Sequence, residues 1–519
     1  MQTLVRKLFT WRALPLWFFV IAVLFVLGHQ AVNWSGERRW TAMKAKIEGA
    51  GETLDFTALL PLAIEETHNF CAIEALHGIT LPGDEKSVPG MKRKALNFLG
   101  ERKGKSKAVT TGGVTIGHKV DLGTWFQYAL ETGLLETMPP PETTARALLE
   151  DLDRKHPVLK ELGRASVTRT EAAFVPSLRE RELPHSLFSL VMPHYECVQA
   201  MSKVLRYRAA LALECGDTTT ALQSAQVTLR FEEAFLKEPQ IISNLVAITV
   251  HHLTEETLWN LLEKCSATET DLAALQMSLQ RLDFLKANLA AVRGELVTGI
   301  SGLDFIQSQP DSIAAFFRMA GVDSSKSARL DRAYSRLLPF DGFLNHSRSV
   351  YAHLLFEEVI QPLKTGDLTL IRTAMDRGEA EVKAHMSVLH PTYVYAGLAS
   401  PSMSVLVHMA YCAEVSRRQG MLACALERFF IQHHQYPRAL SELMPAFISQ
   451  VPNDPIDHLP MRYRQTKAGR YVLWSIGFDQ RDDGGQVNIY ARDVPVDRNL
   501  RKPNYKGDWA WQYEEVKPR

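Results

Sequence analysis

The side chains best suited to metal chemistry lie in one run of the chain, His251-His252 followed by Glu255-Glu256. Residues four apart share a face of a helix, so one histidine and one glutamate project together at each spacing. A zinc site with two histidines and a glutamate could be drawn from this run, but the sequence indicates no third ligand on the same face. We therefore expect a solvated helix face here rather than a metal site.

Sequence motifs of catalysis are absent. The chain contains no G-x-S-x-G elbow, no P-loop, no G-x-G-x-x-G fingerprint and no H-E-x-x-H pair. The six cysteines include no C-x-x-C pair, which argues against a zinc or thioredoxin-like site and predicts buried free thiols. An enzyme remains an alternative, with a site assembled in a cleft between helices from distant parts of the chain.

Length and composition describe a globular chain of more than one unit. At 519 residues the chain exceeds the ~250–300 residues at which one core stops growing. Hydrophobic residues make up 46% and charged residues 23%, which excludes both a disordered chain and a polytopic membrane protein. The net charge of +1 gives no overall field that would attract nucleic acid, so no nucleic-acid partner is expected.

An apolar segment near the N-terminus predicts a membrane anchor. Residues 13–27 are almost uninterruptedly apolar, and the segment 13–32 reaches the ~20 residues that span a bilayer. A cleaved signal peptide is the alternative, because basic residues precede the apolar core. No clean small-x-small cleavage site follows it, so we expect an uncleaved signal anchor that contacts the membrane through residues 13–32.

Flanking charges predict the orientation of this anchor. Arg6, Lys7 and Arg12 precede the apolar segment closely, whereas Arg38 and Arg39 follow it at a greater distance. Basic residues close to a span favour the cytoplasmic side. We therefore expect a single-pass protein of the cell membrane, with residues 1–36 as cytoplasmic stub and anchor and with an extracytoplasmic body.

Residues 37–400 predict a large helical body. Apolar residues recur three and four apart, with a subdivision expected near the proline run at 139–142. Helices 205–215 and 218–236, joined at Gly216-Asp217, are similar to a tetratricopeptide unit, but no fixed period repeats it. Ordinary helix packing is favoured, and a peptide-binding adaptor stays an alternative. A stripe of leucines predicts a core face: Leu272, Leu275, Leu279, Leu282, Leu285 and Leu289.

A basic stretch, 92–107, predicts an exposed loop. Its seven lysines and arginines are accounted for by solubility, and the functional alternative is contact with anionic lipid or an acidic partner. No interleaved aromatic residues indicate stacking on nucleic acid.

Residues 401–500 predict a small α+β module. A helix at 402–434 is followed by a short helix at 438–444. Strands are expected at 461–464, 471–476 and 487–490, which together give a long helix packed on a small antiparallel sheet. In the aromatic tail, 501–519, three aromatic residues alternate at period two, typical of an added strand or an interfacial patch: Trp509, Trp511 and Tyr513.

The order of motifs in this module resembles that of the major pseudopilin of type II secretion systems. A helix leads to Tyr436-Pro437, then to Asp454-Pro455, then to a tyrosine-containing strand and the Ser475-x-Gly477-x-Asp479 sequence. The resemblance covers about 65 of the 519 residues. Two features depart from the family: the N-terminus has no pilin processing site, and several hundred residues separate the anchor from the module. We therefore do not expect filament assembly by the pilin route.

In that family the acidic loop binds calcium, and the matching residues here are Asp479, Asp482 and Asp483. Clustered carboxylates next to glycines can supply the oxygen ligands that a hard cation needs. The alternative is a polar turn in which the aspartates bond to nearby backbone and glycine takes positive φ.

Together these patterns predict a mainly α-helical protein with an N-terminal transmembrane helix, a helical body and a small pseudopilin-like module. The function expected is a structural or interaction role in the cell envelope, with other envelope proteins as partners and an association with secretion implied by the resemblance alone. A membrane-tethered enzyme and a helical peptide-binding adaptor are the alternatives.

Overall fold

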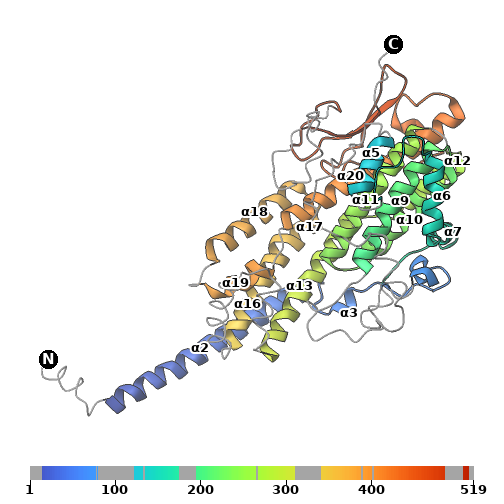
Figure 1. The fold of residues 1–519 in the computed structure, drawn as a ribbon. Coiled ribbons are helices and arrows are strands. Elements are labelled where there is room, and N and C mark those ends of the chain that lie inside the picture. Colours follow the sequence, from blue (N-terminus) through green and yellow to red (C-terminus); the bar gives the residue numbers. More distant parts are fainter. Residues whose placement is uncertain are drawn as a thin grey trace. The chain divides into compact units, whose positions relative to one another are not determined.

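The computed structural model describes residues 14–76, 79, 122–131, 135–174, 194–264, 267–309, 341–386, 390–399, 403–485 and 507–513. The described chain is mainly α-helical, with one apolar N-terminal helix and a three-stranded antiparallel sheet near the C-terminus (Figure 1). The predicted fold class is therefore confirmed. The basic stretch 92–107 and the predicted strand 487–490 lie outside the described residues.

The chain forms two compact units. Unit 1 consists of the described residues within 1–58 and 295–403, and unit 2 of those within 59–182, 191–294 and 404–519. The helix α13 (Phe284–Ser308) contributes its first part to unit 2 and its second part to unit 1. Residues of the predicted module, from 404 onward, thus share a unit with helices from the predicted body.

Unit 1 is built on helix α2 (Leu14–Gly49). It also contains α16 (Asp341–Leu355), the π-helix η6 (Phe356–Ile360), α17 (Gln361–Thr365), α18 (Leu368–His385) and α19 (Pro391–Ala399), and α3 (Phe56–Leu59) lies at its boundary with unit 2.

Helix α2 has two halves with different surroundings. Residues 16–27 are apolar and exposed, with Phe18 79% exposed, and α2 is long and apolar enough to cross a membrane. From about Val32 onward the same helix packs along α16. The Oδ1 atom of Asn33 accepts a hydrogen bond from the Gly342 N–H at 2.9 Å, and Lys46 pairs with Glu357 at 2.7 Å. Because both residue numbers increase together, the two helices run parallel.

Two glycines allow this pair to approach closely. A Cβ atom added to Gly36 would lie 2.2 Å from the Gly342 carbonyl oxygen, and one added to Gly342 would lie 2.2 Å from the Val32 carbonyl oxygen. Both obstacles are backbone atoms, which cannot rotate away. Any larger residue at either position would therefore force the helices apart.

The π-helix η6 continues α16 without a break into α17. Pro362 has no N–H to offer to the carbonyl of Glu358 four residues earlier, and its ring would clash with that carbonyl in a regular α-helix. Widening the preceding turn to i→i+5 bonding accommodates such a proline, and the N–H of Gln361 accordingly donates to the Phe356 carbonyl.

Unit 2 contains a helical layer whose central members are α9 (His194–Glu214), α10 (Thr218–Leu236) and α11 (Ile241–Glu263), side by side in Figure 1. Further elements are η2 (Phe70–Ala72), η3 (Glu74–Leu76), α5 (Leu122–Glu131), α6 (Ala145–Lys155), α7 (Val158–Thr168), α12 (Glu269–Gln280), α20 (Met403–His433) and η7 (Leu440–Leu443).

Several local predictions for unit 2 are confirmed. The hairpin turn has Gly216 at φ 74° and Asp217 as the cap of α10, although α9 begins eleven residues before the predicted Leu205. Four leucines of the predicted stripe are buried, but the stripe crosses a break between α12 and α13. The short helix predicted at 438–444 is the 3₁₀ turn η7. The described segment 135–140 is not helical, but the chain on both sides of it belongs to unit 2, and the subdivision expected near 139–142 stays a prediction.

The sheet has the order β1 (Arg462–Gln465), β2 (Tyr471–Ser475), β3 (Trp509–Gln512), with all pairs antiparallel. The third strand comes from the aromatic tail, where alternation at period two predicted an added strand. Trp511 is fully buried, and the Trp259 Nε1–H of α11 donates to the Gln512 carbonyl at 2.9 Å. The tail therefore packs as part of the module.

Candidate functional site

His251 is buried, so the prediction of a solvated helix face is wrong. Its side chain is 1% exposed, and Glu255 and Glu256 beside it are also buried, while His252 alone of the four is partly exposed. The amphipathic reading failed because helices α9 and α10 cover α11 on two sides. Polar residues that alternate along such a helix must then find partners inside the protein.

His251 finds its partner in the neighbouring helix α10. Its Nδ1 atom lies 2.7 Å from Glu232 Oε2, and the Thr254 hydroxyl donates to the other oxygen of the same carboxylate. Glu232 is fully buried. Burial alone would lower the pKa of His251, but the Glu232 carboxylate outweighs it and raises that pKa. We call Glu232, His251 and Thr254 the His251 cluster.

This cluster has the geometry of an oriented imidazole. A carboxylate that binds Nδ1 fixes the ring and leaves Nε2 for a proton, a metal or a substrate. Here Nε2 is buried and has no hydrogen-bond partner among the described residues. Phe284 packs on the ring with centroids 4.7 Å apart. The cluster thus has the components of a base but is enclosed by the core.

A second buried cluster joins His194 to Glu238. The His194 Nε2 atom lies 2.8 Å from Glu238 Oε1, and the Ser243 hydroxyl donates to the other oxygen of that carboxylate. Nucleophilic catalysis requires the hydroxyl to contact the imidazole, which would take its proton. Here the carboxylate stands between the two groups. With Glu238 between His194 and Ser243, the three groups hold the end of α10 and the start of α11 together, and the serine is not activated.

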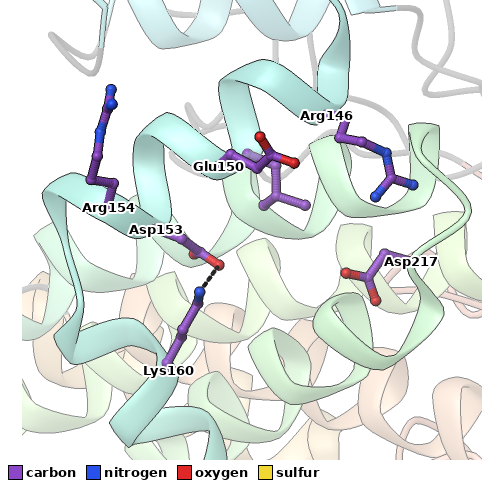
Figure 2. A pocket seen from close by; sticks show the side chains of 7 residues that line it. Arg146, Glu150, Asp153, Arg154, Lys160 and Asp217 are labelled. Carbon is purple, nitrogen blue, oxygen red and sulfur yellow. Dashed lines mark ion pairs between the residues drawn. The ribbon is translucent and has the colours of Figure 1, made fainter.

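An open hollow of about 370 Å³ lies on unit 2 where α6 and α7 meet the start of α10. Figure 2 shows its charged lining. Three cations and three carboxylates contribute, so the formal charge of the lining is zero: Arg146, Arg154, Lys160, Glu150, Asp153 and Asp217. Lys160 pairs with Asp153 at 3.6 Å, and Asp153 also accepts two hydrogen bonds from buried Arg208.

The lining of this hollow offers charged groups. Its lining includes no histidine, cysteine or hydroxyl that could serve as base or nucleophile. Arg146 reaches the Cys215 carbonyl at 3.4 Å, and Glu150 is exposed. Interspersed charges of both signs suit a partner surface that also carries both signs, because each charge then meets its opposite.

The predicted calcium residues lie in one loop, and the structure shows the partners of Asp479 and Asp482. Asp479 accepts the N–H groups of Arg481 and Gly507, at 3.2 and 2.9 Å. Asp482 accepts the Trp474 indole N–H at 2.9 Å and the Arg462 guanidinium at 2.9 Å. Burial would raise the pKa of Asp482, but these donors lower it.

These bonds match the polar-turn alternative. Gly484 and Gly485 take positive φ, as expected for such a turn. Within the described part of the chain no group of three or more His, Cys, Asp or Glu side chains is arranged to hold a metal ion. Calcium binding by Asp479, Asp482 and Asp483 stays a prediction.

Sequence reasoning missed Asp508, which precedes β3. Its side chain is fully buried, and it accepts the N–H of Gly485 at 2.7 Å. Neighbouring Asp482 and Asp483 add to the effect of burial in raising the pKa of Asp508. Asp508 has no local sequence signal for this role, because it binds the Gly485 N–H only when the tail joins the sheet.

The five described cysteines are free, and three of them are buried, in agreement with the prediction of free thiols. No protein-family model, curated protein or solved structure matches this chain.

Proposed function

We propose that this chain is a single-pass envelope protein whose two helical units form a scaffold for other envelope proteins. In this proposal its N-terminus is cytoplasmic, α2 is an uncleaved signal anchor, and the body lies outside the cytoplasm. An association with secretion follows only from the pseudopilin-like order of motifs in the C-terminal module.

One observation carries the proposal: α2 is a single helix whose exposed apolar half continues directly into a half packed against α16. Cleavage of a signal peptide beyond Val32 would remove part of a packed helix pair. Because the second half of α2 is part of the packed fold, we expect the anchor to be retained and the protein to function at the membrane. The mixed-charge hollow supplies a surface suited to a protein partner.

The His251 cluster keeps an enzyme as the second candidate, because a carboxylate-oriented imidazole is a component of many active sites. Such an enzyme would need a motion that exposes His251 to substrate. Exchange of His251 ring protons with solvent on a timescale of seconds would favour it, and full protection over hours would favour the scaffold.

The location can be tested with alkaline phosphatase fused after Arg519, since this enzyme matures only outside the cytoplasm. We expect an active, membrane-bound fusion. A matched fusion that lacks residues 1–31 should be inactive, because nothing exports it. A well-expressed but inactive full-length fusion would contradict the proposed topology.

The scaffold role can be tested by crosslinking in membranes. We expect the full-length protein to form discrete heteromeric products, and the double variant Arg146→Glu, Glu150→Arg to lose one of them. The variant Lys44→Glu, Glu48→Lys swaps a surface pair in unit 1 and serves as the control for charge reversal. A protein that stays monomeric at every crosslinker concentration would refute the scaffold.

A further inference from the structure

His353 of α16 lies among three carboxylates of unit 1. Its Nδ1 atom is 3.4 Å from Glu357 Oε1, and its Nε2 atom is 3.5 Å from Glu381 Oε2 and 3.9 Å from Glu358 Oε1. The imidazole is 32% exposed, so water and protons reach it. Both ring nitrogens face acceptors, and only the protonated ring can offer a donor from each.

The π-helix η6 creates this arrangement. In an α-helix, residue i+4 shares a face with residue i, whereas residue i+5 points elsewhere. The wider turn of a π-helix brings i+5 round as well, so Glu357 and Glu358 both approach His353. Single π turns are frequent at functional sites, which makes this one a place to look for a role beyond packing.

Two of the three carboxylates already pair with permanent cations. Lys46 of α2 pairs with Glu357 at 2.7 Å, and Arg377 of α18 pairs with Glu358 at 2.6 Å. A positive charge on the ring of His353 would add to these two beside the three carboxylates. Burial alone would raise the pKa of Glu357, but hydrogen bonds from Lys46 and His353 lower it.

Further polar and charged groups lie on the packed elements. Tyr393 of α19 donates to Glu381 Oε1 at 2.7 Å, and His385 stacks on the Tyr393 ring. The positive charge of Arg39 in α2 opposes the rise in the pKa of Tyr393 and adds to the lowering of the pKa of His346. In α13, Asp304 forms an ion pair with Arg348 of α16, and Glu295 adds to the effect of burial in raising the pKa of Tyr351.

We propose that His353 is a proton-operated clasp that fastens α18 to the parallel helix pair α2–α16. Helix α18 approaches this pair closely, because a Cβ atom added to Gly378 would lie 3.2 Å from Glu358 Cβ. The protonated ring bridges Glu381 of α18 to Glu357 and Glu358. The neutral ring donates one hydrogen bond at most and leaves an unbalanced negative charge between the helices.

The direction with pH follows from this chemistry. Histidine is the side chain whose charge ordinarily changes between pH 5 and 8. Contacts that favour the charged ring stabilise docking at low pH and are lost as pH rises through this range. Docking of α18 is therefore expected to be tighter at acidic pH than at alkaline pH. If the body is extracytoplasmic, as proposed above, the clasp responds to the pH of that compartment.

Hydrogen exchange of residues 368–385 in the full-length protein in detergent tests the clasp. After correction for intrinsic exchange, we expect protection to fall about fivefold between pH 5.5 and 8.5, the scale of a partly exposed ion contact. His353→Gln should be loose at both pH values. His353→Arg, with a permanent charge, should be protected at both.

Two controls separate the clasp from general pH effects. His252→Gln changes a partly exposed histidine of unit 2 that lies 3.7 Å from Glu255, and it should leave the response of α18 intact. All measurements are repeated in a Glu295→Gln background, because burial raises the pKa of Glu295 to about 7 and it titrates in the same range.

Retention of the pH response of α18 in His353→Gln would overturn the proposal. So would a His353→Arg protein that is as loose at pH 8.5 as the wild type. If His353→Gln does not fold, Glu381→Gln leaves two carboxylates to balance Lys46 and Arg377, and this variant should have no pH response in α18. Because the measurement uses detergent, its failure would leave the proposed location untouched.

Discussion

The two units use histidine–carboxylate pairs in opposite ways. In unit 2, His251 is 1% exposed and its partner Glu232 is fully buried. In unit 1, His353 is 32% exposed and faces three carboxylates that also bind Lys46 and Arg377. An enclosed pair holds one protonation state and stiffens the core, whereas a half-exposed one exchanges protons and can respond to the surroundings.

Access to water, and not the identity of the two residues, decides which role a histidine–carboxylate pair takes. The sequence drew attention to His251-His252 because four polar residues stand close together. His353-x-x-x-Glu357-Glu358 has a similar composition, but its importance depends on a π turn and on Glu381, which lies 28 residues further along the chain. Four variants test this comparison.

The largest effect is expected from Glu232→Ala. The change leaves the His251 imidazole and the Thr254 hydroxyl without their partner inside the core. Breaking a buried pair from one side costs about 3–5 kcal/mol. Urea unfolding followed by hydrogen exchange in α10 and α11 would measure it. Glu214→Ala, which removes an exposed pair with Lys264, is the control and should cost below about 1 kcal/mol.

Gly342→Ala should destabilise unit 1 by about 3 kcal/mol, the upper end of the range for overpacking. The added methyl group would meet the Val32 backbone at 2.2 Å, so α2 and α16 must separate. Limited proteolysis within 341–386 would report the change. Gly49→Ala places its methyl group in open space and should leave cleavage unchanged. Equal cleavage of both variants would refute the close helix contact.

Glu295→Gln should remove a pH dependence from unit 1. Since burial raises the pKa of Glu295 to about 7, the fold favours the protonated acid. That stability is complete below the ordinary carboxyl value near 4.3 and is lost as pH rises through 7. Hydrogen exchange in 295–308 between pH 5 and 8 would show it. A wild-type response that persists in Glu295→Gln would assign the effect to another group.

The smallest effect is expected from Asn288→Leu in α13. Both side-chain polar atoms of Asn288 are buried and lack partners among the described residues. A leucine of similar size removes them and should stabilise unit 2 by about 1 kcal/mol. Asn260→Leu, which removes a bonded amide, should be destabilising. A loss of stability in Asn288→Leu, measured by urea unfolding, would show that water or a ligand satisfies this amide.

Much of the fold follows from sequence patterns, and most of the site does not. The apolar N-terminal helix, the hairpin at Gly216-Asp217 and the strands β1 and β2 have local causes: apolar length, a capping aspartate and alternation. The His251 cluster joins α10 to α11, and the hydrogen bond from the Gly485 N–H to Asp508 joins residues 23 apart in the chain. Such pairs depend on which helices become neighbours, and this information has no local signature.

Helix α2 has a mechanical consequence. Its 36 residues form a continuous rod about 54 Å long, and in the proposed topology the apolar first half would lie in the bilayer. The second half is locked to α16 through Gly36 and Gly342, so it cannot swivel at a flexible joint. A span that is too long or too short for its bilayer tilts. Bilayer thickness would thereby set the angle at which unit 1 stands.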